Sequence, residues 1–130
     1  SHHNGDANKG AQLAKIDLWE MTNFAYFLQK MDAVTEGNGT MLDNSLVFLS
    51  NELSDGNAHN QGATKYTNFT GPTGKPIVLA GSAGGKLNTG RHAIYNDASQ
   101  ADLFIALLNM LDVPVTTFGT AGTAPLTGLT

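Results

Sequence analysis

Two short, continuously apolar runs constrain the fold of this chain more than any other feature of its sequence. One is residues 46–49 (LVFL), inside a strand predicted over residues 42–49, and the other is residues 76–81 (PIVLAG). Strands that are apolar on both sides of the pleat are typical of a sheet covered on both faces. The chain has 130 residues, enough for one domain and too few for two. We therefore expect a single unit, residues 1–130, in which helices flank these strands.

Two helices are predicted, one before and one after the strand region. Over residues 11–33, apolar side chains recur on one helical face. These side chains are Leu13, Ile16, Phe24, Phe27, Leu28 and Met31. We expect this face to cover the sheet and to bury Phe24 and Phe27. The second helix is expected to begin at the capping box of residues 99–102 (SQAD) and to end before Pro114.

The remaining segments are predicted to be turns and loops. Gly-Asn-Gly at residues 37–39 is expected to end the first helical unit. Residues 50–75 show no convincing period, and loops of this length inside a domain are usually functional or disordered. Residues 86–95 predict a short ribbon, and the Thr-, Gly- and Ala-rich residues 116–130 a surface tail. The order helix, strand, loop, strand, helix indicates an α/β fold, a fragment of a larger sheet flanked by helices.

Composition excludes several classes of function. The net charge is −4, from 7 basic and 11 acidic residues, and there is no basic stripe of the kind that nucleic-acid binding needs. No apolar run approaches the ~18 residues of a membrane span. The sequence contains no cysteine, which excludes disulfides, cysteine zinc sites and thiol nucleophiles. It also contains no Gly-x-Ser-x-Gly nucleophile motif.

Side chains that can bind a metal follow the first predicted strand. Glu52, Asp55 and His59 lie just beyond it, next to Asn51. In open α/β sheets, ligands collect beyond the carboxyl ends of the strands. Carboxylate oxygens and imidazole nitrogens bind hard and borderline cations. The alternative interpretation is a solvated polar loop with one exposed histidine.

The chain opens with the sequence Ser1-His2-His3. Adjacent histidines in a strand face opposite ways, so both can bind one ion only from an irregular turn. They are better suited to binding two ions, or to one acting as a ligand while the other donates a hydrogen bond in the outer sphere. The alternative is the remnant of an affinity tag or a disordered terminus. Because a tag usually has six histidines in a row, we favour a fragment of a longer protein.

Three further charged residues are candidates for a site. Glu20 falls in the middle of the apolar face of the first helix, where an unpaired carboxylate is costly to bury. It is expected to meet a metal, a histidine or an arginine, or alternatively to reach solvent. Arg91 has a guanidinium that can bind an anion, and His92 follows it. Such a pair more often lies on the surface.

Several motifs of this chain resemble the C-terminal part of the bacterial HXXSHH proteins, a domain family of unknown function. They are Ser1-His2-His3, Gly56-Asn57-Ala58-His59-Asn60, Leu79-Ala80-Gly81 and Leu87-Asn88-Thr89-Gly90-Arg91-His92, together with Leu42-Asp43-Asn44-Ser45-Leu46-Val47. The resemblance covers nearly the whole chain, although the leading histidine of the name motif lies outside it. It favours the fragment interpretation and implies an exported protein, periplasmic or secreted.

A more distant resemblance concerns residues 43–50 (DNSLVFLS), which are similar to a late strand of the alkaline phosphatase and sulfatase superfamily. In that superfamily the strand ends in Asp-His or in a Glu that helps to hold a metal. Here Asn51 and Glu52 follow the strand, so Glu52 is implied as a ligand, Asn51 as a weaker one, and His59 matches the later histidine loosely. The departure from Asp-His leaves zinc, calcium and manganese open. The nucleophile of the superfamily lies far upstream of this segment.

The resemblances together imply a metal-dependent hydrolase that acts on small or polymeric phosphate or sulfate esters. The implied ligands are His2, His3, Glu52 and His59, and the implied outer-sphere or anion-binding residues are Glu20, Asn51, Asp55, Arg91 and His92. Ligands of one ion lie within about 4 Å of one another, so we expect His2 or His3 to approach Glu52 or His59. The alternative is an exported binding or surface protein without catalytic activity, since fold does not determine function.

Overall fold

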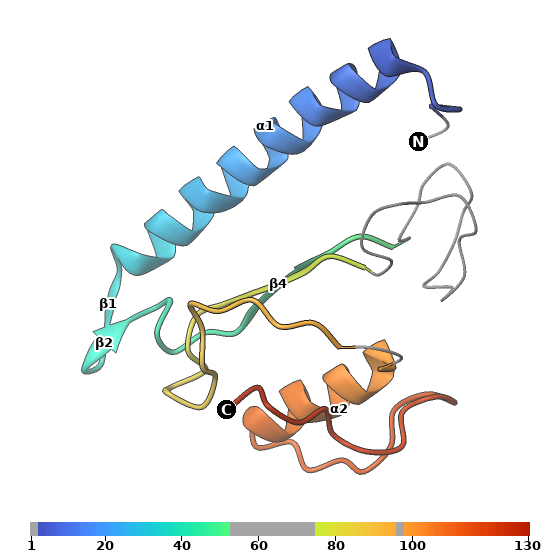
Figure 1. Cartoon of the computed structure of the whole chain (residues 1–130). Coiled ribbons are helices and arrows are strands. Elements are labelled where there is room, and N and C mark those ends of the chain that lie inside the picture. Colours follow the sequence, from blue (N-terminus) through green and yellow to red (C-terminus); the bar gives the residue numbers. More distant parts are fainter. Residues whose placement is uncertain (1–2, 53–74, 96–97) are drawn as a thin grey trace.

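The computed structural model describes residues 3–52, 75–95 and 98–130. In this part of the chain, a long helix α1 (Ala7–Asp32) lies on one side of a two-stranded ribbon, and a shorter helix α2 (Gln100–Met110) lies on the other side (Figure 1). The ribbon consists of β3 (Val47–Ser50) and β4 (Ile77–Ala80). A small hairpin of β1 (Thr35–Glu36) and β2 (Gly39–Thr40) connects α1 to the segment that leads into the ribbon. The protein therefore combines helices with antiparallel strands, and the prediction of a mixed α and β fold is confirmed at that level.

Helix α1 spans Ala7–Asp32 and begins four residues earlier than predicted. Its start is set by Asp6, whose carboxylate accepts hydrogen bonds from the backbone N–H groups of Asn8 and Lys9 at 2.8 and 3.0 Å. A side chain in this N-cap position satisfies amide donors that have no partner within the helix. Because Ala7, Asn8, Lys9 and Gly10 carry no large apolar side chain, hydrophobic periodicity could not locate this first turn.

A two-residue hairpin follows α1. Strands β1 (Thr35–Glu36) and β2 (Gly39–Thr40) pair antiparallel across a turn made by Gly37 and Asn38. Gly37 has a φ of 59°, and glycine at the first central position of a hairpin turn accepts this positive φ without steric cost. The Gly-Asn-Gly motif thus lies close to the end of the helical unit, as predicted, whereas the hairpin itself was not predicted.

Strands β3 (Val47–Ser50) and β4 (Ile77–Ala80) form the ribbon, paired antiparallel with Phe48 opposite Leu79. Side chains alternate across a strand, and the face that bears Phe48 and Leu79 packs against the core. The strand predicted to begin at residue 42 begins instead at Val47: residues 42–44 belong to the preceding turn, and residues 45 and 46 are outside the strand. There the N–H of Ser45 donates to the carbonyl of Leu42 at 3.1 Å.

The turn that follows β4 is fixed against this preceding turn. The N–H of Ala83 donates to the carbonyl of Ser45 at 2.9 Å, and both the N–H of Gly84 and the hydroxyl of Ser82 donate to the carbonyl of Asp43, at 2.8 and 2.6 Å. Gly81, which ends β4, has a φ of 85°. The glycine-rich turn therefore serves to bring two stretches of backbone into close contact.

Helix α2 spans Gln100–Met110, and its predicted cap is partly confirmed. The Ser99 side chain accepts from the N–H of Ala101 at 3.2 Å, as an N-cap does. Asp102 does not complete the capping box by accepting from Ser99. Its carboxylate accepts instead from the N–H groups of Thr123 and Ala124, at 2.9 and 3.3 Å.

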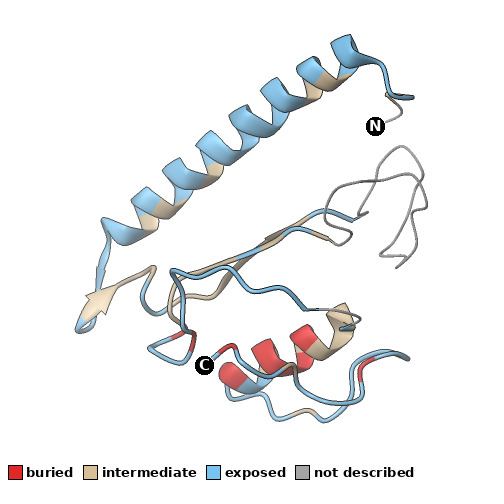
Figure 2. Ribbon diagram, viewed as in Figure 1, coloured by how far each residue is buried: buried red, intermediate tan, exposed pale blue. Residues whose placement is uncertain are grey.

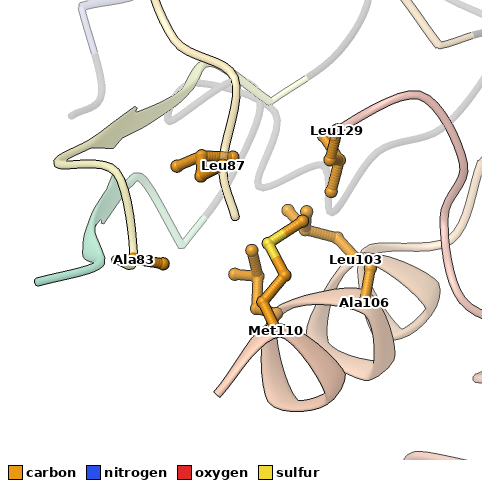
Figure 3. Close-up of a cluster of buried hydrophobic side chains, with 7 residues drawn as sticks. Ala83, Leu87, Leu103, Ala106, Met110 and Leu129 are labelled. Carbon is orange, nitrogen blue, oxygen red and sulfur yellow. The ribbon is translucent and has the colours of Figure 1, made fainter. Parts of the chain in front are cut away.

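The buried core lies between α2, the ribbon and two segments without regular structure (Figures 2 and 3). Its buried members are Ala83, Leu87, Leu103, Ala106, Leu107, Met110 and Leu129. Leu46, Phe48, Ile77, Leu79, Phe104 and Leu126 are partly buried against them. Helix α2 thus supplies most of the core, and the ribbon closes it from one side.

Residues 86–95 contain no strand, so the predicted ribbon there was wrong. Leu87 anchors this segment in the core, and the N–H of Asn88 donates to the carbonyl of Leu129 at 3.0 Å. Residues 116–130 are largely exposed, as expected of a surface tail, but Leu129 is buried and the backbone of Leu126 donates to Asp102. The hydrogen bond from Asn88 to Leu129 joins residues 86–95 to residues 116–130. Hydrophobic periodicity within either segment does not predict this contact.

Helix α1 is the main departure from the predicted packing. None of its residues is buried; Phe24 is half-buried and Phe27 is 48% exposed (Figure 2). The expected burial of both rings was therefore wrong. A helix of 26 residues is about 39 Å long, whereas strands of four residues span about 13 Å. The ribbon is too short to cover the apolar face of α1.

Removing the carboxylate of Asp102 tests how the C-terminal segment is attached. We expect Asp102→Ala to lower the free energy of unfolding by about 1–3 kcal/mol, because two backbone N–H groups lose a charged acceptor. Urea unfolding followed by circular dichroism measures this change. Asp17→Ala is the matched control: Asp17 is exposed on α1 and should change stability by less than about 0.5 kcal/mol. Equal effects of the two substitutions would contradict the proposed attachment.

Candidate functional site

The structure describes two of the four predicted metal ligands. His3 and Glu52 lie in the described part of the chain, whereas His2 and His59 lie outside it, as does Asp55. The predicted approach of His2 or His3 to Glu52 or His59 therefore stays a prediction. Within the described residues, no group of three or more His, Asp or Glu side chains has the arrangement of a metal site.

His3 is half-buried just before α1. Its Nδ1 accepts a hydrogen bond from the N–H of Gly5 at 3.2 Å, and its carbonyl accepts from the N–H of Asp6 at 2.9 Å. In a neutral imidazole one nitrogen accepts and the other carries the proton. Binding a metal through Nε2 therefore requires the other tautomer and the loss of the bond from Gly5. This local turn orients the ring but competes with its use as a ligand.

Glu52 and Asn51 directly follow β3, and both are exposed. The strand before them is anchored: Phe48 packs against the core, and the hydroxyl of Ser50 donates to the carbonyl of Pro76 at 3.2 Å. The scaffold thus holds a solvent-accessible carboxylate at the end of a paired strand. A carboxylate in this position has the donor chemistry and the accessibility that a divalent cation needs.

Because β3 and β4 pair antiparallel, their carboxyl ends lie at opposite ends of the ribbon. The last residue of β3, Ser50, pairs with the first residue of β4, Ile77. Glu52 therefore follows the end of the ribbon at which β4 begins, while the glycine turn that leads to Arg91 follows the opposite end. The rule that ligands collect beyond the carboxyl ends of neighbouring strands applies to parallel sheets, so it gives no reason to expect Glu52 and Arg91 at one edge of this ribbon.

The other predicted site residues in the described part of the chain are exposed. Glu20 is exposed on the middle of α1, which agrees with the alternative that it reaches solvent. Arg91 and His92 are exposed as well. The Nε of Arg91 donates to the carbonyl of Asn88 at 3.0 Å, so part of the guanidinium stabilises its own loop. In the described part of the chain, neither Glu20 nor His92 belongs to a group of three or more His, Asp or Glu side chains that could hold a metal ion.

One open hollow of about 490 Å³ lies at the C-terminal end of α2. It is lined by Asn109, Asp112, Pro114, Val115 and Thr116. Its titratable group, Asp112, forms an ion pair with Lys86 at 2.7 Å, and the Oδ1 of Asn109 accepts from the N–H of Val115 at 2.9 Å. The carboxylate of Asp112 and the amide oxygen of Asn109 are thus used within the fold. None of the residues predicted from the sequence lines it.

The described residues define a mixed α and β protein with one compact core around α2 and an accessible carboxylate after β3. Comparison with protein-family models, with curated proteins and with solved structures finds no match to the chain. Among the described residues, neither helix combines the length and apolarity needed to cross a membrane.

Proposed function

We propose that this chain is the metal-binding C-terminal segment of an exported hydrolase of phosphate or sulfate esters. The observation that carries the proposal is the position of Glu52. This residue is exposed two positions beyond the end of β3, and β3 itself packs against the core. The sequence places His59 seven residues further on, and His2 and His3 before α1. The resemblance to HXXSHH proteins and to the alkaline phosphatase and sulfatase superfamily supports the same assignment.

The donor types of these residues suit a divalent cation. Glu52 offers carboxylate oxygens, and the histidines offer imidazole nitrogens, a mixture that favours zinc or manganese over calcium. When bound, such a cation polarises the ester and stabilises the negative charge that develops on it. In this proposal the chain serves to hold the cation. Glu52 supplies a negatively charged ligand, and His3 supplies a nitrogen ligand once its ring adopts the tautomer with a free Nε2.

Metal titration tests the assignment directly. We expect the 130-residue protein to bind Zn²⁺ or Mn²⁺ in isothermal titration calorimetry, and Glu52→Gln and His59→Gln each to weaken binding at least about tenfold, since even the loss of an outer-sphere partner has effects of that size. Glu36→Gln is the matched control, because the carboxylate of Glu36 accepts from Asn44 at 3.0 Å in the remote hairpin and glutamine keeps an acceptor there. Unchanged affinity in all three variants would refute the ligand assignment.

The isolated chain is expected to lack esterase activity. Ester hydrolysis needs an activated nucleophile as well as charge stabilisation, and the superfamily resemblance places that nucleophile far upstream. We expect no turnover of p-nitrophenyl phosphate or p-nitrophenyl sulfate above background with added zinc, calcium or manganese. Metal-dependent turnover that Glu52→Ala abolishes would show that residues 1–130 contain a complete active site.

The second candidate is an exported binding or surface protein without catalytic activity. The exposed apolar side chains of α1 favour it, since Trp19 is 67% and Ile16 51% exposed, and large exposed apolar patches are typical of interaction surfaces. Calorimetry separates the two candidates. Metal affinity that depends on Glu52 supports the hydrolase, whereas the absence of metal binding supports the binding protein.

A further inference from the structure

We draw no further inference here: the strongest candidate, the exposed apolar surface in the middle of helix α1 around Ile16, Leu18, Trp19 and Met21, carries none because nothing in the structure shows what covers it.

Discussion

Replacing Gly81 by alanine is expected to be the most damaging single substitution in this protein. Gly81 has a φ of 85°, a conformation that costs a residue with a Cβ about 1–2 kcal/mol. An added Cβ would also overlap the carbonyl oxygen of Ser45 and lie 2.7 Å from that of Leu42. Both obstacles are backbone atoms, so no side-chain rotation relieves the overlap. We expect a loss of at least about 3 kcal/mol in the free energy of unfolding, or failure to fold.

Gly84→Ala provides the control for this experiment. Gly84 also has a positive φ, 67°, but a Cβ there would meet no atom within 4 Å. The substitution should therefore lower the free energy of unfolding only by the about 1–2 kcal/mol that a positive φ costs a residue with a Cβ. Chemical unfolding of both variants, followed by far-ultraviolet circular dichroism, measures the difference. If the two variants were equally stable, the close contact between the turn before β3 and the turn after β4 would be refuted.

The second large effect is expected when a core leucine is shortened. Leu103 is 5% exposed within the cluster around α2, and Leu→Ala at such sites costs about 2–5 kcal/mol because a cavity is left behind. Leu18→Ala is the matched substitution on α1. Leu18 is 69% exposed, so its shortening should change the free energy of unfolding by less than about 0.5 kcal/mol.

This pair of variants tests where the stability of the protein resides. Had Phe27 been buried, as the sequence predicted, Phe27→Ala would lower the free energy of unfolding by about 3–5 kcal/mol. With Phe27 48% exposed, we now expect a smaller loss than for Leu103→Ala. Comparable losses in the free energy of unfolding for Leu18→Ala and Leu103→Ala would mean that α1 is buried in solution. That result would contradict the exposure of Leu18 in the structure.

For the predicted site, residue patterns predict where a side chain lies along its own strand, but not which distant side chains come close to it. The placement of Glu52 after an apolar strand is local information, and the structure confirms that it follows β3. Whether Arg91 or Glu20 approaches Glu52 depends on the direction of strand pairing and on the packing of α1. A pattern of apolar and polar residues is the same for parallel and antiparallel neighbours over such short runs, so the sequence could not decide this.

Local preferences in the sequence determined the helices and the ribbon strands themselves. Ser99 caps α2, and a 3.6-residue period marks most of α1. The apolar run at residues 46–49 overlaps β3 in all but its last residue, and the run at residues 76–81 contains β4. Each of these signals acts between residues close together in the chain, through hydrogen-bond capping or the spacing of side chains on one face.

Only the tertiary structure decided what those elements pack against. Leu87 and Leu129 enter the core from segments without regular structure, and Asp102 binds the backbone of Thr123 and Ala124 rather than its own helix start. Helix α1, which has a recognisable apolar face, buries none of its residues. Hydrophobic burial depends on which surfaces meet and on how far they extend. A ribbon of two short strands therefore cannot bury a helix of 26 residues, whatever the pattern of that helix.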